Sequence, residues 1–221
     1  TSADSALTIT PETSMPGLDP FLVPWSSEPM PNPAGATVRR LTLNEDVAMH
    51  AYFSLQGRTA LVTGGTRGIG RMIAQGFLQA GARVFICARD AAACAEVAAE
   101  LSVYGECIGL AADLSSEEGA TVLAEQLGAQ VQQLDILVNN AGTTWGAPLE
   151  SYPAKGWEKV MQLNVTSVFS CIQKLLPLLR KAGSATNPAR VINIGSVAGI
   201  TSHGEDAYAY GPSKAALHQL S

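Results

Sequence analysis

The chain has 221 residues, 47% of them apolar, and a formal net charge of −5. This length fits one large domain, or one domain with an appendage, and the apolar share is enough for a sizeable core. The sequence has no basic stripe and no run of 18 apolar residues, so we expect neither nucleic-acid binding nor a membrane span.

The four cysteines, at positions 87, 94, 107 and 171, show no paired CxxC spacing, and the three histidines are scattered. We therefore expect neither a disulfide framework nor a metal site, and a reducing cytoplasm is the expected location.

Residues 1–48 differ from the rest of the chain. They hold seven of the twelve prolines, with two basic and six acidic residues, and no sustained periodicity. Such sequence buries too little surface to offset the entropy cost of ordering, so we expect a disordered or loosely attached extension. A specific docking role is the alternative. Met49 is a plausible natural start of the folded unit, which we expect to span residues 49–221.

From Phe53 onward, short apolar runs alternate with segments of helical periodicity. The predicted strands are 59–63, 83–88, 106–112, 134–139 and 190–194. The predicted helices are 69–80, 90 to about 102, 115 to about 131 with a capping box on Ser115 and Glu118, one or two helices over 155–180 with Pro177 bending the last turns, and a helix from 207 onward. This alternation predicts an α/β fold: a doubly wound parallel sheet of Rossmann type, in three layers, with ligands at the carboxyl ends of the strands.

The first predicted strand runs into a glycine-rich stretch, Thr63-Gly-Gly-Thr-Arg-Gly-Ile-Gly70. Its glycines, at 64, 68 and 70, let backbone N–H groups approach a pyrophosphate at the start of a helix. The spacing is neither that of the commonest dinucleotide fingerprint nor that of a P-loop. An ordinary turn between a strand and a helix is the alternative.

The second predicted strand ends at Ala88, next to Arg89. NAD-binding units carry an acidic residue about 20 positions after the glycines, and this chain has none there. Arg89 and Arg67 instead suit a 2′-phosphate, which a guanidinium can bind through two parallel N–H bonds. NADP(H) is therefore the predicted cofactor. The alternative is two solvated arginines, one of them paired with Asp90.

The next two strands also end in polar residues. Asp113 follows the third strand and could accept a hydrogen bond from an adenine amino group, or could simply cap a helix. Asn139-Asn-Ala-Gly142 follows the fourth strand. Its amides could hold neighbouring strands together and line a ribose pocket, although Asn and Gly also make ordinary turns.

Ser196 follows the fifth strand, and Tyr210-Gly-Pro-Ser-Lys214 comes fourteen residues later. Tyr210 and Lys214 are four positions apart, so they share one face of a helix. A free tyrosine has a pKa of about 10, and a neighbouring ammonium stabilises its phenolate, which suits proton transfer near neutral pH. Ser196 could hydrogen-bond the carbonyl oxygen that Tyr210 protonates. Tyr208 has Pro212, not a lysine, four positions further along, so we reject it as the tyrosine that transfers the proton.

These motifs, together with Asn164 in LNVTS, resemble the short-chain dehydrogenase/reductase family over residues 53–221. The resemblance implies a catalytic set of Ser196, Tyr210, Lys214 and Asn164. Tyr210 would be the general acid, Lys214 would bind the nicotinamide ribose, and Asn164 would hold a water in a proton relay. The cofactor contacts that it implies are Gly64, Thr66, Arg67, Gly68, Ile69, Gly70, Arg89, Asp113, Leu114, Asn140, Ala141, Gly142, Tyr210 and Lys214.

Within this family, four stretches are similar to NADPH-dependent reductases of 3-oxoacyl thioesters: residues 49–58, 82–90, 157–172 and 190–200. The resemblance implies a small-molecule or carrier-bound acyl substrate and a homotetramer or homodimer. Divergence is expected at 201–206, near the mouth of the site. The alternatives are a reductase of the same family for another ketone, sugar or secondary alcohol, and a non-catalytic NADP-binding sensor or scaffold.

Folds of this type have six or seven strands, and about five are readable before Ser221. We therefore expect further strands and a substrate lid beyond this residue, and we expect the 221 residues alone to be inactive.

Overall fold

The computed structural model describes residues 53–201 and 206–221. The Pro-rich segment 1–48 and the expected start at Met49 lie outside these ranges and stay predictions, as does most of the 201–206 region. Within the described ranges, no helix is long and apolar enough to cross a membrane, and no cluster of three or more His, Cys, Asp or Glu could hold a metal ion.

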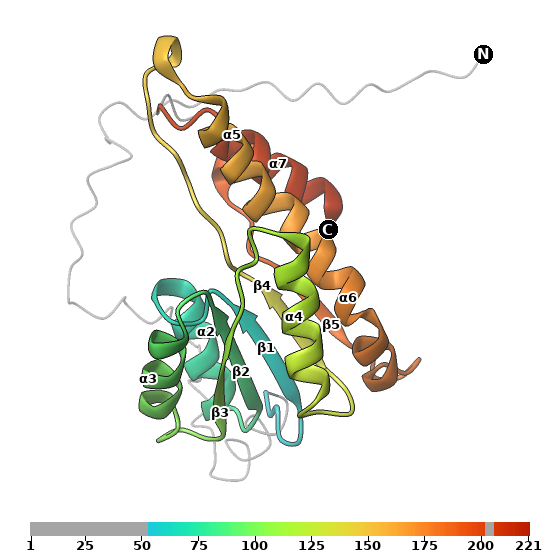
Figure 1. The fold of residues 1–221 in the computed structure, drawn as a ribbon. Helices are drawn as coiled ribbons and strands as arrows, with labels where there is room; N and C mark the ends of the chain where they lie inside the picture. Colours follow the sequence, from blue (N-terminus) through green and yellow to red (C-terminus); the bar gives the residue numbers. More distant parts are fainter. Residues whose placement is uncertain (1–52, 202–205) are drawn as a thin grey trace, which may run out of the picture. The chain divides into compact units, whose positions relative to one another are not determined.

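Five parallel strands form one sheet in the order β3-β2-β1-β4-β5 (Figure 1). The strands are β1 (Thr59–Thr63), β2 (Arg83–Ala88), β3 (Cys107–Ala111), β4 (Ile136–Asn139) and β5 (Arg190–Asn193). Because all of them are parallel, their carboxyl ends meet at one edge. The predicted doubly wound fold is confirmed, and the neighbouring β1 and β4 lead to opposite halves of the sheet, which is where such folds bind ligands.

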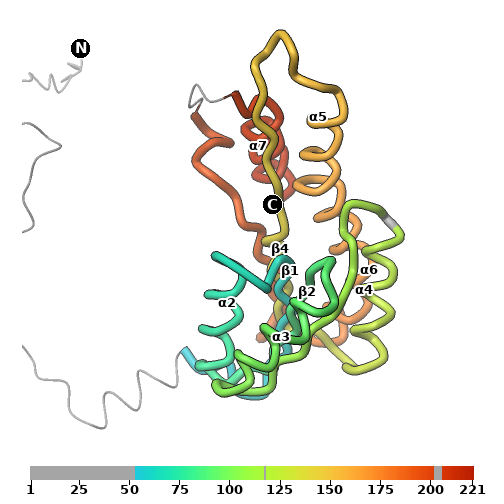
Figure 2. The backbone as a smooth tube through the Cα atoms, turned by 60° about the vertical axis from the view of Figure 1, so that its left-hand side comes forward, coloured from blue at the N-terminus to red at the C-terminus, as the bar shows by residue number. Residues whose placement is uncertain are grey.

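Helices cover both faces of this sheet. The long helices are α2 (Gly68–Gln79), α3 (Ala91–Leu101), α4 (Glu117–Gly128), α5 (Ala154–Met161), α6 (Ser167–Ala182) and α7 (Tyr210–Leu220). Short helical turns are η1 (Leu149–Ser151), the π-helical η2 (Gln162–Thr166) and η3 (Val197–Gly199). In Figure 2, α2 and α3 lie on one side of the strands, and α4 and α6 lie on the other.

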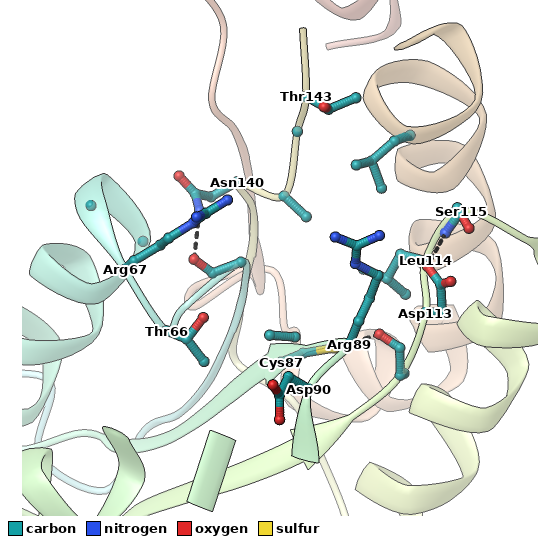
Figure 3. A pocket seen from close by; sticks show the side chains of 18 of the residues that line it. Thr66, Arg67, Cys87, Arg89, Asp90, Asp113, Leu114, Ser115, Asn140 and Thr143 are labelled. Carbon is teal, nitrogen blue, oxygen red and sulfur yellow. Dashed lines mark hydrogen bonds between the residues drawn. The ribbon is translucent and has the colours of Figure 1, made fainter. Parts of the chain in front are cut away.

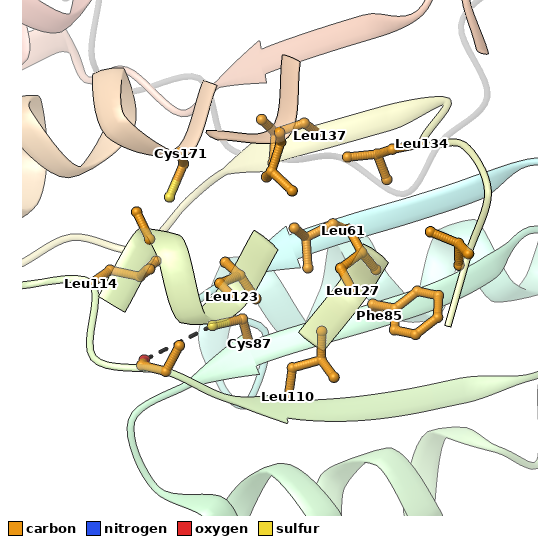
Figure 4. Close-up of a cluster of buried hydrophobic side chains, with 14 of the residues drawn as sticks. Leu61, Phe85, Cys87, Leu110, Leu114, Leu123, Leu127, Leu134, Leu137 and Cys171 are labelled. Atoms are coloured by element: carbon orange, nitrogen blue, oxygen red, sulfur yellow. Dashed lines mark hydrogen bonds between the residues drawn. The ribbon is translucent and has the colours of Figure 1, made fainter. Parts of the chain in front are cut away.

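The strands supply two hydrophobic cores because successive side chains point to opposite faces. Leu61, Phe85 and Leu137 pack with α4 and α6 (Figure 4). Val62 and Ile86, each one residue further along its strand, pack on the other face with α2 and α3. The edge strand β5 is less covered, and its Val191 and Ile192 are each 41% exposed.

The helix boundaries correct the sequence prediction in two places. Ser116, not Ser115, caps α4, because its Oγ accepts from Gly119 N at 3.1 Å. The predicted capping box is therefore wrong: a capping box needs Glu or Gln at the third helical position, which here is Gly119. The region 155–180, predicted as one or two helices, consists of α5 and α6 joined by the π-helical turn η2, which the prediction did not include.

The remaining shifts are small. The helix predicted to reach about Val131 ends at Gly128, β4 begins two residues later than predicted, and β5 ends one residue earlier. Pro177 lies inside α6, which continues to Ala182.

The amino-terminal end of the sheet is fixed by a buried carboxylate. Asp135, 4% exposed, accepts from Arg58 Nη1 at 2.9 Å and from Thr59 N at 3.0 Å, and thereby links β1 to β4. Replacing it with Ala leaves a part-buried N–H and a guanidinium whose side chain is 36% exposed without their acceptor. We expect Asp135→Ala to lower the free energy of unfolding by about 2 kcal/mol, measured by urea denaturation. The exposed pair of Arg83 and Glu106 (2.7 Å) provides the control. Glu106→Gln should cost under about 1 kcal/mol, and equal losses would contradict this account.

The buried thiols predict how stability depends on pH. Burial raises the pKa of both Cys87 and Cys171 from 9.0 to about 12. Above about pH 9 the unfolded chain therefore loses protons that the folded chain keeps, so stability falls as pH rises. The loss approaches about 1.4 kcal/mol per pH unit for each thiol. Urea unfolding at a series of pH values should show this slope, and Cys171→Ala should reduce it. An unchanged slope in the variant would rule the thiol out as its source.

Candidate active site

The carboxyl ends of the strands enclose a cavity of about 990 Å³. Its walls come from the segments that follow β1, β2, β3 and β4, with α5 and η2 contributing Lys159 and Leu163. Its lining includes the following residues predicted to contact the cofactor: Gly64, Thr66, Arg67, Gly68, Ile69, Gly70, Arg89, Asp113, Leu114, Asn140, Ala141 and Gly142. The cavity thus lies at the edge of the sheet where the sequence predicts a ligand site.

The glycine loop forms a cradle at the start of α2. Gly64 and Gly68 adopt positive φ angles of 65° and 55°, which side chains disfavour. A Cβ on Gly70 would overlap the carbonyl oxygen of Gly64 and the side chain of Asn140, whereas a Cβ on Gly68 would meet nothing within 4 Å. The loop is therefore tightly packed behind and open in front. The open side faces an anion site at a helix N-terminus.

Two guanidinium groups extend into the cavity. Arg67 precedes α2 with an extended backbone, its side chain makes no capping bond, and Arg89 follows β2 (Figure 3). Asp90 caps α3, accepting from Ala92 N at 2.9 Å and Ala93 N at 3.1 Å. Within the described ranges no ion pair joins Arg89 to Asp90, so the alternative in which Asp90 neutralises Arg89 is not what the structure shows.

Asp113 shapes the turn after β3. Its Oδ1 accepts from Ser115 N at 3.1 Å, and the helix cap is Ser116. The alternative reading of Asp113 as the cap of α4 is therefore wrong. Leu114 is buried beside it and lines the same wall. Adenine contact by Asp113 stays a prediction.

The Asn139–Gly142 segment ties the centre of the sheet together. Asn139 Nδ2 donates to Asn193 Oδ1 at 2.9 Å, joining β4 to β5. Asn140 Nδ2 donates to Thr63 O at 2.9 Å and to Gly64 O at 3.2 Å, which fixes the glycine loop. The predicted role of these amides in holding neighbouring strands is confirmed.

Thr63 is a supporting residue that the sequence prediction missed. Its buried Oγ1 donates to Val138 O at 3.2 Å and accepts from the backbone N–H groups of Asn140 and Ala141, both at 3.0 Å. The signal available in the sequence was a threonine at the end of an otherwise apolar strand.

Asn164 lies in the π-helical turn η2 and is 1% exposed. Its Oδ1 accepts from Thr143 N at 2.8 Å. Its Nδ2 donates to Thr143 O and to Ser213 Oγ, both at 2.9 Å. The amide therefore clamps a cavity-lining residue to α7. Both Nδ2 hydrogens are used in this clamp, so any water relay through Asn164 would have to use its other polar atoms.

Tyr210 is the first residue of α7, and Lys214 follows one turn later, as predicted. Lys214 is 6% exposed. Its Nζ donates to Ile194 O at 2.7 Å and lies 5.7 Å from the centroid of the Tyr210 ring. Burial lowers the pKa of Lys214. Ser196 begins η3, and its Oγ accepts from Ala198 N at 3.2 Å. Helix α7 packs against η3, which brings the three residues to one region.

A family model for short chain dehydrogenases matches residues 58–221. The chain belongs to the short-chain dehydrogenase family. It is 76% identical over 173 residues to the rhamnolipids biosynthesis 3-oxoacyl-[acyl-carrier-protein] reductase of Pseudomonas aeruginosa, covering 78% of this chain and 68% of that protein. A tropinone reductase homolog of Arabidopsis thaliana is 39% identical, with coverages of 76% and 61%.

Solved structures of short-chain dehydrogenases agree with the fold. The Pseudomonas aeruginosa RhlG/NADP active-site complex matches with a TM-score of 0.76 and 76% identity, covering 77% of this chain and 66% of that one. An NADP-bound 3-oxoacyl (acyl-carrier-protein) reductase from Agrobacterium tumefaciens matches with a TM-score of 0.71 and 32% identity, with coverages of 81% and 67%. The chain spans about two thirds of the length of these relatives.

The predicted dehydrogenase residues fall into two groups. The predicted cofactor contacts line the cavity, except for Tyr210 and Lys214, which lie outside its lining with Ser196. Hydrogen bonds join the two groups: Thr143 to Asn164, Asn164 to Ser213, and Ser213 Oγ to Tyr210 O at 2.7 Å. Ser213 is a second supporting residue that the sequence prediction missed, although it stands inside the YGPSK motif.

Proposed function

We propose that this protein is an NADPH-dependent carbonyl reductase that converts 3-oxoacyl thioesters into 3-hydroxyacyl products. The observation that carries the proposal is the placement of Tyr210 and Lys214 on one face of α7, beside the segment that holds Ser196 and linked to the cavity through Asn164. The 76% identity to the Pseudomonas aeruginosa enzyme supports the 3-oxoacyl substrate class.

The residues of the cavity fit a nicotinamide dinucleotide phosphate. The open front of the glycine loop at Gly68 leaves room for a pyrophosphate at the start of α2. Arg67 and Arg89 would bind the 2′-phosphate, and no carboxylate follows directly on β2 at Ala88 to repel it. When bound, the cofactor supplies the hydride.

The chain's own residues would then hydrogen-bond and protonate the carbonyl oxygen of the substrate. The hydroxyl groups of Ser196 and Tyr210 donate hydrogen bonds to this oxygen, and Tyr210 transfers its proton as negative charge develops there. Lys214, held by Ile194 O, places an ammonium near the Tyr210 ring and binds the nicotinamide ribose. Asn164 keeps Thr143 and α7 in register.

The substrate is proposed to be bound to a carrier protein or coenzyme A, and the working protein to be a homotetramer or homodimer in the cytoplasm.

The test, like each activity measurement below, uses the full-length protein: oxidation of NADPH is followed by absorbance in the presence of acetoacetyl-CoA. Turnover above the substrate-free rate is expected, and NADH should be a poorer donor. Turnover only with other ketones or secondary alcohols would shift the proposal to another reductase of the family. Tight NADPH binding without turnover of any of them would favour a sensor or scaffold instead.

A further inference from the structure

His218 lies on the same face of α7 as Tyr210 and Lys214, at successive intervals of four residues. Its Nε2 accepts a hydrogen bond from the backbone N–H of Ser196 at 3.3 Å. Lys214 Nζ donates to Ile194 O at 2.7 Å. Two successive turns of α7 therefore hold the segment after β5, one through a carbonyl and the other through an N–H group, two residues apart.

The backbone around this imidazole is shaped to admit it. A Cβ on Gly195 would overlap His218 Nε2, and a Cβ on Gly199 would overlap the α7 backbone at Lys214 and Ala215 and lie 2.8 Å from His218 Cε1. A side chain at Gly195 would push the imidazole away from Ser196, and one at Gly199 would push α7 itself away. The contact is thus built from both sides, by a histidine on the helix and by glycines on the segment that it meets.

The position of the Ser196 hydroxyl depends on this contact. Ser196 has an extended backbone (φ −161°, ψ 149°), and its Oγ is oriented by Ala198 N at 3.2 Å. The Ser196 N–H is held by His218, so the residue is fixed through both its backbone and its side chain. Without the imidazole, the N–H loses its acceptor on α7, the helix that carries Tyr210.

We propose that His218 is a positioning residue for carbonyl reduction: its neutral imidazole fixes the backbone of Ser196 relative to Tyr210. This inference rests on the proposed function. The imidazole can accept at Nε2 only in the tautomer that carries its proton on Nδ1, and an imidazolium cannot accept at all. The contact is therefore lost when His218 becomes charged.

Three substitutions separate this role from simple packing. The side-chain oxygen of Gln reaches the place of Nε2, whereas Asn reaches only the place of Nδ1. We expect His218→Gln to keep kcat within a few-fold of wild type, and His218→Asn and His218→Leu to lower it roughly 10- to 100-fold with an unchanged Kd for NADPH. Gln219→Leu, at the next residue of α7 and exposed like His218, is the matched control.

The outcomes separate the two proposals. Wild-type protein without reductase activity would refute the proposed function and this inference with it. An active wild type whose Asn and Leu variants keep full kcat would overturn the inference alone. Equal loss in all three variants, accompanied by a lower Tm, would assign His218 to packing and also overturn it.

Discussion

Replacing Tyr210 with Phe is expected to lower kcat by about 10²- to 10⁴-fold, the range typical of a lost general acid. The phenyl ring keeps the packing at the start of α7, and Ser213 Oγ still donates to the backbone carbonyl of residue 210 at 2.7 Å. Only the proton donor is removed. The Kd for NADPH should therefore change less than about tenfold, since the hydroxyl contributes one hydrogen bond at most.

Tyr208 provides the matched control for this substitution. It lies two residues before Tyr210 and is partly exposed, and its hydroxyl donates to Asp206 Oδ1 at 3.3 Å. Tyr208→Phe removes the same atom from the same segment, yet it should keep kcat within a few-fold. Steady-state assays with acetoacetyl-CoA and fluorescence titration with NADPH measure both quantities. Comparable kcat losses in the two variants would mean that Tyr210 is not the acid.

The sheet and the cavity could be predicted from the sequence because their determinants are local. A continuous apolar run such as Thr59–Thr63 is a strand wherever it packs, and β1 and β2 have the predicted boundaries. A parallel sheet then brings the strand ends together, so the glycine loop, Arg89, Asp113 and Asn140 had to share one edge.

The supporting contacts could not be predicted because they depend on distant parts of the chain. The periodicity of 155–180 predicts one or two helices, but it does not reveal the π-helical turn η2, which places Asn164 between Thr143 and Ser213. The resemblance supplied a water-holding role for Asn164, but not this clamp. Likewise, the spacing of Ser115 and Glu118 favours Ser115 as the cap by sequence, yet Ser116 is the cap in the structure. The choice between them is made by Asp113 Oδ1, which accepts from Ser115 N.

The second large effect is expected from the two arginines of the cavity, which should determine the preference for NADPH over NADH. We expect Arg67→Ala and Arg89→Ala each to weaken NADPH binding about 10- to 100-fold, the range for losing charge-assisted hydrogen bonds to a phosphate. NADH binding should change only a few-fold because it lacks the 2′-phosphate. Paired titrations with NADPH and NADH measure the ratio of the two Kd values directly.

Arg71 is the control for these variants, because it lies one turn along α2 and its Nη2 pairs with Glu100 Oε2 at 2.8 Å on the surface. Arg71→Ala should leave the ratio of the Kd values for NADPH and NADH unchanged.

Salt provides a second check. Raising the ionic strength should weaken NADPH binding more than NADH binding in wild type, and this difference should shrink in the Arg67→Ala, Arg89→Ala double variant. If both arginines bind one phosphate, the double variant should lose less than the sum of the single losses, because either substitution alone already disrupts the shared contact. Arginine variants that weaken NADPH and NADH equally would place these side chains on the pyrophosphate and leave the preference for NADPH without its proposed cause.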